Sequence, residues 1–314
     1  MLTKSKPPEL SHLLTMKSLD AAKITYLIDR AEYFLKNVIA KNAVLDTLRG
    51  KVIANLFFEP STRTRNSFEI AEKRLGAIIL SPSMSESSTT KGELLVDTLH
   101  NLTAMGTSLF VIRHPDNNLA EFLATELRSS AAIVNAGDGS NEHPTQTLLD
   151  LMTIRQHFKD FSKLTVAIVG DVKHSRVARS LISGLNTMGV QQIRLITPKN
   201  LAIDNPEALN ATVFHDVEAG LKEVDIVYAL RTQKERMAAT LHPNDDQFFK
   251  SFGITEDRLM LAKPSAIVMH PGPMNRGVEI ASNVADGPQS VILQQTRNSV
   301  AVRMAVIETL LINR

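Results

Sequence analysis

Short apolar runs, separated by longer stretches with helical periodicity, constrain the fold of this 314-residue chain most strongly. Each run has the length of one buried strand. The runs lie at residues 52–58, 77–80, 109–112, 131–134, 164–169, 193–196, 224–230 and 266–269. In one intervening stretch Phe68, Ala71 and Leu75 share a helical face, and Gly76 offers a C-terminal stop. Because strands that alternate with helices form parallel sheets, we predict an α/β fold.

Two apolar helical segments indicate how the strands are grouped. Residues 145–158 form a long candidate helix that divides the runs into two groups of about four. Residues 300–312 form a second candidate helix, with no strand after it. A chain of 314 residues exceeds the usual size of a single core, so we expect two α/β halves. The last helix is expected to pack back on the N-terminal half.

The composition limits the classes of partner. A formal net charge of +2 gives no large field for nucleic acid or an anionic membrane surface, so we expect neither partner. The absence of cysteine excludes disulfides, a thiolate nucleophile and cysteine-based metal sites. The N-terminal segment lacks an unbroken apolar core and a cleavage site, and no 18-residue apolar stretch occurs. A cytoplasmic location is therefore expected.

The pentapeptide STRTR, which begins at Ser61, follows the first apolar run and opens a helical stretch. A helix N-terminus directs free backbone N–H groups and partial positive charge at an anion. The hydroxyls of Ser61, Thr62 and Thr64 add donors. Arg63 adds a planar fork suited to phosphate, whereas Arg65 is predicted to be structural. An ordinary N-cap with exposed arginines would explain this segment alone, so its interpretation depends on the other strand ends.

Most other strand ends also carry hydrogen-bond donors. They are Arg113, His143, Gln146, Arg176, Arg231 and Gln233, and the segment HPGP at 270–273 follows the last run. Ligands of open parallel sheets bind beyond the carboxyl ends of the strands. Almost no carboxylate or metal-ligand cluster follows a strand, and GxSxG, HExxH, Walker and GxGxxG motifs are absent. The sequence therefore predicts a site for anionic substrates, with catalysis by orientation and charge stabilisation.

Seven blocks, taken in order, resemble the catalytic chains of the aspartate carbamoyltransferase family. They read FxEPSTRTRxSFE, KGExLxDT, RHP, NAGDGxxxHPTQTLLDL, GDxKHSRVARS, RxQKER and HPGPxNRGVEI, and the resemblance runs from about residue 10 to the C-terminus. STRTR and HPxQ occur throughout the carbamoyltransferase superfamily. The aspartate assignment follows from HPTQ at 143–146 and HPGP at 270–273, where ornithine enzymes typically carry HPCQ and HCLP, and from the RxQ at 231–233.

The resemblance implies a carbamoyltransferase fold of two parallel sheets flanked by helices, without a cofactor or metal. It places a carbamoyl phosphate-binding domain at 1–145 plus 298–314 and an L-aspartate-binding domain at 146–297. The implied carbamoyl phosphate site comprises Ser61, Thr62, Arg63, Thr64, Arg113, His143, Gln146, Pro271, Gly272 and Pro273. The implied aspartate site comprises Lys91, Arg176, Arg231 and Gln233. Arg63, Thr64, Lys91, Arg113 and His143 are the implied catalytic residues.

A polar loop at 81–93 acquires a role through the same resemblance. Family members are homotrimers whose active sites are shared between neighbours, and Lys91 and Ser87 match the loop residues that enter from the adjacent subunit. Thr90 stands where some relatives have a second lysine, and the loop is compressed relative to some bacterial members, so Ser87 is the less secure match. The sequence alone is also explained by a solvent-exposed loop without a functional role. The resemblance leaves open a regulatory or dihydroorotase-like partner chain.

Three other functions are compatible with parts of this pattern. A carbamoyltransferase for another amino acid, such as ornithine, would share the phosphate site, but the RxQ and HPGP blocks disfavour it. A nucleotide-binding oxidoreductase would share the strand alternation, but the glycine fingerprint is missing. A catalytically silent assembly subunit would keep the fold, yet each expected site position carries the expected chemistry. The expected activity is transfer of a carbamoyl group to L-aspartate in pyrimidine biosynthesis.

Overall fold

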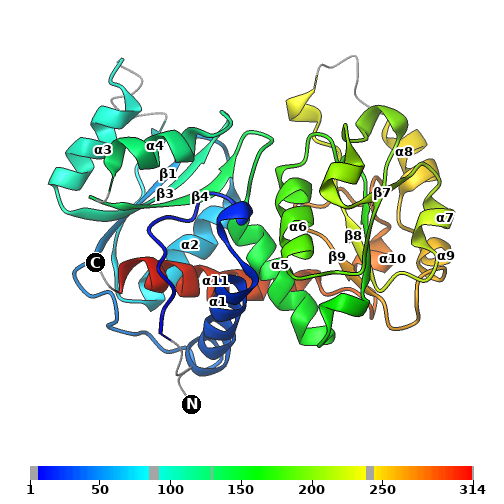
Figure 1. The fold of residues 1–314 in the computed structure, drawn as a ribbon, viewed down its shortest axis with the longest axis horizontal. Helices are drawn as coiled ribbons and strands as arrows, with labels where there is room; N and C mark the ends of the chain where they lie inside the picture. Colours follow the sequence, from blue (N-terminus) through cyan, green and yellow to red (C-terminus); the bar gives the residue numbers. More distant parts are fainter. Residues whose placement is uncertain (1–5, 85–91, 129, 238–243, 313–314) are drawn as a thin grey trace. The chain divides into compact units, whose positions relative to one another are not determined.

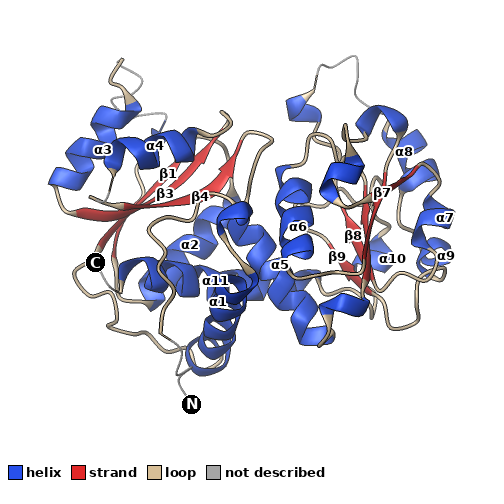
Figure 2. Ribbon diagram, in the orientation of Figure 1, coloured by secondary structure: helices blue, strands red, loops and turns tan. Residues whose placement is uncertain are grey.

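The computed structural model describes residues 6–84, 92–128, 130–237 and 244–312. The chain divides into two compact units, one of Met1–Met152 with Thr296–Arg314 and the other of Thr153–Gln295 (Figure 1). Each unit contains a parallel sheet covered by helices (Figure 2). The predicted α/β class with two parallel sheets is confirmed.

The first unit has a four-stranded sheet, in the order β2-β1-β3-β4 among the described residues. Its strands are β1 (Val52–Phe57), β2 (Ile78–Leu80), β3 (Thr107–His114) and β4 (Ala132–Asp138). Its helices are α1 (Ala21–Phe34), α2 (Thr62–Arg74), α3 (Leu95–Ala104) and α4 (Leu119–Leu127), with parts of α5 (Pro144–His157) and α11 (Ile292–Leu311). Because β1, β3 and β4 are parallel neighbours, the segments that follow them lie at one edge of the sheet.

Local chemistry explains the bounds of the first βα unit. The inner residues of β1 are fully buried, as expected for a continuous apolar run in a parallel sheet. Phe68, Ala71 and Leu75 are buried on α2, as their spacing predicted. Gly76 follows the helix with a φ of +80°, and a Cβ there would lie 2.5 Å from Leu45 O. Only glycine therefore fits this stop without a shift of the backbone.

The second unit has a five-stranded parallel sheet, in the order β7-β6-β5-β8-β9 among the described residues. Its strands are β5 (Thr165–Val169), β6 (Gln192–Ile196), β7 (Thr212–Phe214), β8 (Ile226–Ala229) and β9 (Ile267–Met269). Its helices are α6 (Arg176–Thr187), α7 (Val217–Leu221), α8 (Asp245–Phe252), α9 (Glu256–Leu259) and α10 (Ser282–Ala285). The sequence missed β7, because this short edge strand is only partly buried and contains no apolar run.

The two apolar helical segments are present. The predicted helix at 145–158 is α5, which begins at Pro144 and ends at His157. The predicted helix at 300–312 is the C-terminal part of α11, which begins eight residues earlier, at Ile292. Its early turns contain the polar residues QQTRNS, so the apolar pattern did not indicate where this helix begins. Residues from Thr296 onward belong to the first unit. The unit ends at 152 and resumes at 296, whereas the sequence placed these ends at 145 and 298.

A buried carboxyl joins α2 to β1. Glu72 is fully buried, and its Oε2 accepts a hydrogen bond of 2.8 Å from Asn55 Nδ2 on β1. Burial raises the pKa of Glu72 to about 8, with a smaller contribution from Glu69, while Asn55 and Lys73 act in the opposite direction. In the folded protein this carboxyl is therefore protonated at neutral pH.

The pKa of Glu72 predicts a pH-dependent effect of Glu72→Gln. Between about pH 4.5 and pH 8 the folded chain holds a proton that the unfolded chain lacks, so this group makes stability fall as pH rises. The slope is up to about 1.4 kcal/mol per pH unit. Glu72→Gln removes this pH dependence. The melting temperature of the variant minus that of the wild type should therefore increase from pH 5 to pH 8. Calorimetry across that range tests this expectation, and a pH-independent difference contradicts it.

Candidate active site

The pentapeptide STRTR lies at the start of α2, separated from the end of β1 by three residues. Ser61 is the N-cap in extended conformation, and its hydroxyl makes no capping hydrogen bond to the helix. The side chains of Thr62 and Arg63 are exposed, and Thr64 is 8% exposed. The first turn of α2 thus offers backbone N–H groups, hydroxyls and a guanidinium to one anion. The phosphate cradle formed by these residues stays a prediction.

Arg65 has the structural role that the sequence predicted. Its Nε lies 3.1 Å from Glu69 Oε1, and its Nη2 donates to Ser81 O at 3.0 Å. Through Ser81, these contacts join the first turns of α2 to the segment after β2. Arg65 therefore differs from Arg63, although the two arginines are only two positions apart.

Arg113 lies near the end of β3, paired in register with Phe57 of β1. Its Nε lies 3.2 Å from Glu59 Oε2, and its Nη1 lies 3.5 Å from Ala136 O. The side chain is half-buried. The sheet therefore brings Arg113 to the edge that carries the start of α2, and Glu59 and the β4 carbonyl orient its guanidinium.

The loop between β4 and α5 positions His143 and Gln146. Asp138 is 2% exposed, and its carboxylate accepts from Asn118 N at 2.7 Å, Asn135 Nδ2 at 2.8 Å and Glu142 N at 3.0 Å. Pro144 begins α5, and Gln146 N donates to His143 O at 3.0 Å. A buried carboxylate thus fixes the loop that presents both predicted donors.

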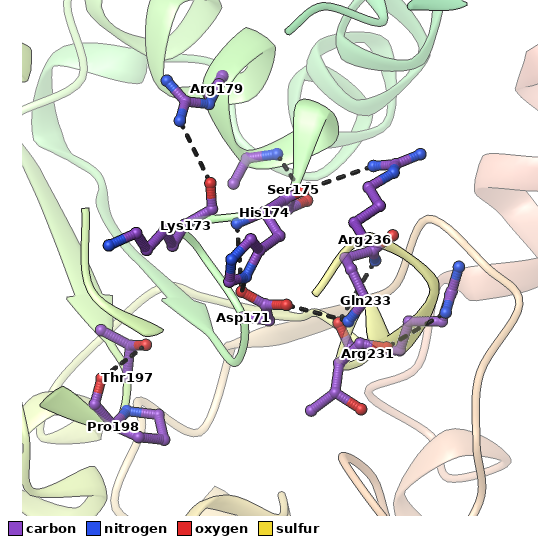
Figure 3. A network of polar contacts seen from close by, with 12 residues as sticks. Asp171, Lys173, His174, Ser175, Arg179, Thr197, Pro198, Arg231, Gln233 and Arg236 are labelled. Atoms are coloured by element: carbon purple, nitrogen blue, oxygen red, sulfur yellow. Dashed lines mark hydrogen bonds and ion pairs between the residues drawn. The ribbon is translucent and has the colours of Figure 1, made fainter. Parts of the chain in front are cut away.

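In the second unit, Asp171 joins the loops after β5 and β8 (Figure 3). Asp171 is fully buried, and its Oδ2 accepts from Gln233 N at 3.0 Å. Its Oδ1 accepts from His174 N at 3.2 Å and lies 2.9 Å from His174 Nδ1. Because β5 and β8 are neighbours, this carboxylate holds the RxQ turn against the segment that leads into α6.

The predicted carboxylate-binding residues of this unit come from those two loops. Arg176 begins α6 and is 3% exposed, directly after the N-cap Ser175. Arg231 forms an ion pair with Glu235, in which Nη1 lies 3.0 Å from Oε2 and Nη2 contacts Oε1. Burial acts to raise the pKa of Glu235, but the hydrogen bonds from Arg231 hold it below its ordinary value. Glu235 is therefore ionised and orients the Arg231 fork.

The HPGP segment follows β9 and has a buried histidine behind it. His270 Nδ1 accepts from Gly272 N at 2.8 Å, and His270 Nε2 lies 3.0 Å from Glu279 Oε1. His270 and Glu279 are each 2% exposed. Since the Gly272 N–H must donate, Nδ1 carries no proton and Nε2–H donates to Glu279. This pair shapes the turn that contains Pro271, Gly272 and Pro273, whose Gly272–Pro273 peptide is cis.

The expectation that strand ends deliver almost no carboxylates is wrong. Asp138 and Asp171 directly follow or end strands, and Glu59, Glu235 and Glu279 lie in the segments after them. Asp138, Asp171, Glu235 and Glu279 accept hydrogen bonds from backbone or side chains of these segments, and Glu59 forms an ion pair with Arg113, so the five carboxylates orient these groups. The sequence signals were NAGD and VGD, where an acid follows an apolar run and a glycine.

Ser87 and Lys91 lie outside the described residues. Within the described ranges, no group of three or more His, Asp or Glu side chains could hold a metal ion. No helix in this part of the chain is long and apolar enough to span a membrane.

Comparison with known proteins follows this division of the chain. Residues 11–156 match the family described as the aspartate/ornithine carbamoyltransferase carbamoyl-P binding domain, and residues 162–310 match its Asp/Orn binding domain. An aspartate carbamoyltransferase catalytic subunit from Coxiella burnetii is 53% identical over 304 residues, which cover 96% of each chain. The chain belongs to the aspartate carbamoyltransferase family.

Solved carbamoyltransferases share the fold of this family member. The Trypanosoma cruzi aspartate transcarbamoylase with carbamoyl phosphate and aspartate aligns with a TM-score of 0.86 at 29% identity, covering 98% of this chain and 100% of that one. Its complex with N-(phosphonacetyl)-L-aspartic acid gives 0.85 at 31% identity, with coverages of 97% and 98%. An ornithine carbamoyltransferase from Thermus thermophilus gives 0.83 at 26% identity, with coverages of 97% and 100%.

Proposed function

We propose that this chain transfers the carbamoyl group of carbamoyl phosphate to the α-amine of L-aspartate. The observation that carries the proposal is the pair of donor sets at the carboxyl edges of the two sheets. One is a helix N-terminus with hydroxyls and Arg63, suited to phosphate. The other is the RxQ turn with Arg231, which Glu235 orients and which suits carboxylates. The products are N-carbamoyl-L-aspartate and phosphate, in pyrimidine biosynthesis in the cytoplasm.

The first unit holds carbamoyl phosphate in this proposal. Ser61, Thr62, Arg63 and Thr64 bind its phosphate, and Arg113, His143 and Gln146 surround its carbamoyl group. Backbone groups of Pro271, Gly272 and Pro273 contact the carbamoyl amide. The burial of Thr64 and His143, at 8% and 4% exposed, supports these roles, because hydrogen bonds are stronger where water is excluded.

The second unit holds L-aspartate through its two carboxylates, which bind Arg176, Arg231 and Gln233. Arginine forks bind carboxylates in bidentate geometry, so they select an acidic substrate over one with an amine side chain. The backbone N–H of Gln233 donates to Asp171 at 3.0 Å and its side-chain Nε2 donates to Arg231 O at 3.4 Å, so both contacts fix the turn that carries the Gln233 amide. This arrangement favours aspartate over ornithine.

The reaction forms a C–N bond and breaks the bond from the carbamoyl carbon to the phosphate oxygen. The aspartate amine attacks the carbonyl carbon, and the resulting oxyanion accepts hydrogen bonds from Thr64, Arg113 and His143. Loss of one such donor typically costs about 10²- to 10³-fold in rate. The intermediate collapses as phosphate leaves with the electron pair and takes the amine proton. No side-chain general base is required by this scheme.

Product formation tests the proposed reaction. Purified protein is incubated with carbamoyl phosphate and either L-aspartate or L-ornithine, without added metal. Carbamoyl aspartate alone is the expected product. Carbamoyl ornithine would overturn the assignment of the second substrate, and no product with either would favour a catalytically silent subunit.

The proposal includes a homotrimer with shared sites, in which Lys91 and, with it, Ser87 enter from the neighbouring subunit. It rests on the sequence resemblance, since both residues lie outside the described part of the chain. A closed trimer has three equivalent interfaces, and each would combine STRTR of one subunit with Lys91 of the next.

Mixing inactive subunits is expected to restore activity. Lys91→Ala and Arg63→Ala trimers are each inactive, but in mixed trimers some interfaces regain both residues. Random mixing of equal amounts should return about one quarter of the wild-type sites. Activity is measured after dissociation and reassembly, with each variant reassembled alone as the control. Verified mixed trimers without recovered activity would argue against sharing.

A further inference from the structure

One turn behind Gln146, α5 carries a buried carboxylate that the proposed roles do not use. Asp150 is fully buried, and its Oδ1 accepts a hydrogen bond of 3.0 Å from Gln146 Nε2. Residues four apart lie on the same face of a helix, so this contact follows from the spacing within HPTQTLLD. Gln146 is itself only 8% exposed. The hydrogen bond to Asp150 therefore holds the side-chain amide of Gln146, a predicted substrate-binding residue.

Arg303 supplies a buried positive charge to the same region of the first unit. It lies on α11 and is 2% exposed, and its guanidinium interacts electrostatically with Asp150. Its Nη1 donates to Ser299 O at 3.1 Å, and its Cζ lies 4.7 Å from the centre of the Phe68 ring on α2. Burial lowers the pKa of Arg303 to about 9, and Asp150 acts in the opposite direction. Arg303 therefore carries its charge at neutral pH, and this charge is opposite in sign to an aspartate carboxylate.

The hydrogen bond to Asp150 determines which way the Gln146 amide faces. A glutamine amide has a donor end and an acceptor end, whereas a carboxylate only accepts. With Nε2 bonded to Asp150, the oxygen Oε1 is the end that remains for a ligand. The reverse orientation would place two acceptors against each other in a buried site, which costs the desolvation of both.

We infer that Asp150, with Arg303 behind it, is a positioning residue that makes Gln146 present its amide oxygen to the NH₂ of the carbamoyl group. The inference rests on the proposed function, in which Gln146 contacts that group. It predicts that the orientation of Gln146 contributes to the choice of a carbamoyl over an acetyl compound. An NH₂ donates to Oε1, and a methyl group cannot.

A matched pair of stable ligands measures this choice without turnover. Phosphonoacetamide carries the NH₂, and phosphonoacetone carries a methyl group in its place. Calorimetry gives the dissociation constants of both for wild type, Asp150→Asn, Gln146→Ala and the double variant. Asparagine is nearly isosteric with aspartate but can also donate, so Gln146 is no longer held in one orientation. The expected result is that Asp150→Asn lowers the amide-over-methyl selectivity by about tenfold, the effect of one hydrogen bond.

The double variant distinguishes positioning from a merely structural role. In the Gln146→Ala background, Asp150→Asn should leave the selectivity unchanged. Equal weakening of both ligands by Asp150→Asn alone would overturn the inference, and so would a selectivity change that persists without the Gln146 amide. If Asp150→Asn does not fold, Arg303→Met should lower the selectivity by removing the neighbouring charge, while Arg303→Lys should retain it. A wild type that binds neither ligand would contradict the proposed function itself.

Discussion

Arg63→Ala is expected to lower kcat/KM for carbamoyl phosphate by about 10²- to 10³-fold, while the chain stays folded. The side chain lies exposed in the first turn of α2, so its removal leaves no cavity. What is lost is a charged fork that adds to the backbone N–H groups and hydroxyls of the same turn. Steady-state kinetics with varied carbamoyl phosphate measures the effect, and the melting temperature reports on folding.

Arg65→Ala is the matched control on the same helix. Arg65 donates to Glu69 and to Ser81 O, so its loss should cost stability rather than activity. Exposed ion pairs of this kind contribute only up to about 1 kcal/mol. We expect turnover within about threefold of wild type. Full activity of Arg63→Ala, or an equal loss in both variants, would remove the basis for a phosphate role specific to Arg63.

Arg231→Ala is expected to raise KM for aspartate by roughly 30-fold or more, with a smaller effect on binding of carbamoyl phosphate. Truncating one partner of a hydrogen-bonded charge pair costs about 2–5 kcal/mol. Two effects combine here, because the substrate carboxylate loses its fork and Glu235 loses the guanidinium that it contacts. The ionised Glu235 would then repel an acidic substrate. Initial rates over a wide range of aspartate concentration give KM.

Two further variants test whether the effect is specific to the planar fork of Arg231 and to its position. Arg231→Lys keeps the charge but not the planar fork, so it should recover only part of the loss. Arg179→Ala removes an exposed arginine of α6 whose Nη2 donates to Lys173 O at 3.2 Å (Figure 3), and it should leave KM near the wild-type value. An unchanged KM for aspartate in Arg231→Ala would exclude Arg231 from the aspartate site.

The sequence was sufficient for the parallel α/β class because buried strands leave continuous apolar runs. The four strands of the first sheet and four of the five in the second have such runs. The partly buried edge strand β7 does not, and its existence depends on pairing with β6. The start of α11 was missed for a related reason, since its first turns are polar. Elements that owe their stability to tertiary contacts leave a weak signal in the sequence.

The donors of the site were easier to predict than the groups that hold them. Arginines and hydroxyls after strands are visible as a pattern at one sheet edge, and the resemblance to a family assigns their roles. Asp138 and Asp171 act through contacts with segments distant in the sequence, namely Asp138 to Asn118 across 20 positions and Asp171 to Gln233 across 62. Such pairings are set by strand order, which a single sequence does not specify. The His270–Glu279 pair was missed for a similar reason, because burial decides its role.

Binding of N-(phosphonacetyl)-L-aspartate tests the central claim most directly, namely that the donor sets of both units serve one reaction. This molecule joins a phosphonate to an aspartate, so one ligand requires both sets. Calorimetry should show one ligand bound per chain in the wild type. Arg63→Ala and Arg231→Ala should each weaken its binding at least about tenfold, the effect of one or more lost hydrogen bonds. Wild-type affinity in either variant would contradict the account.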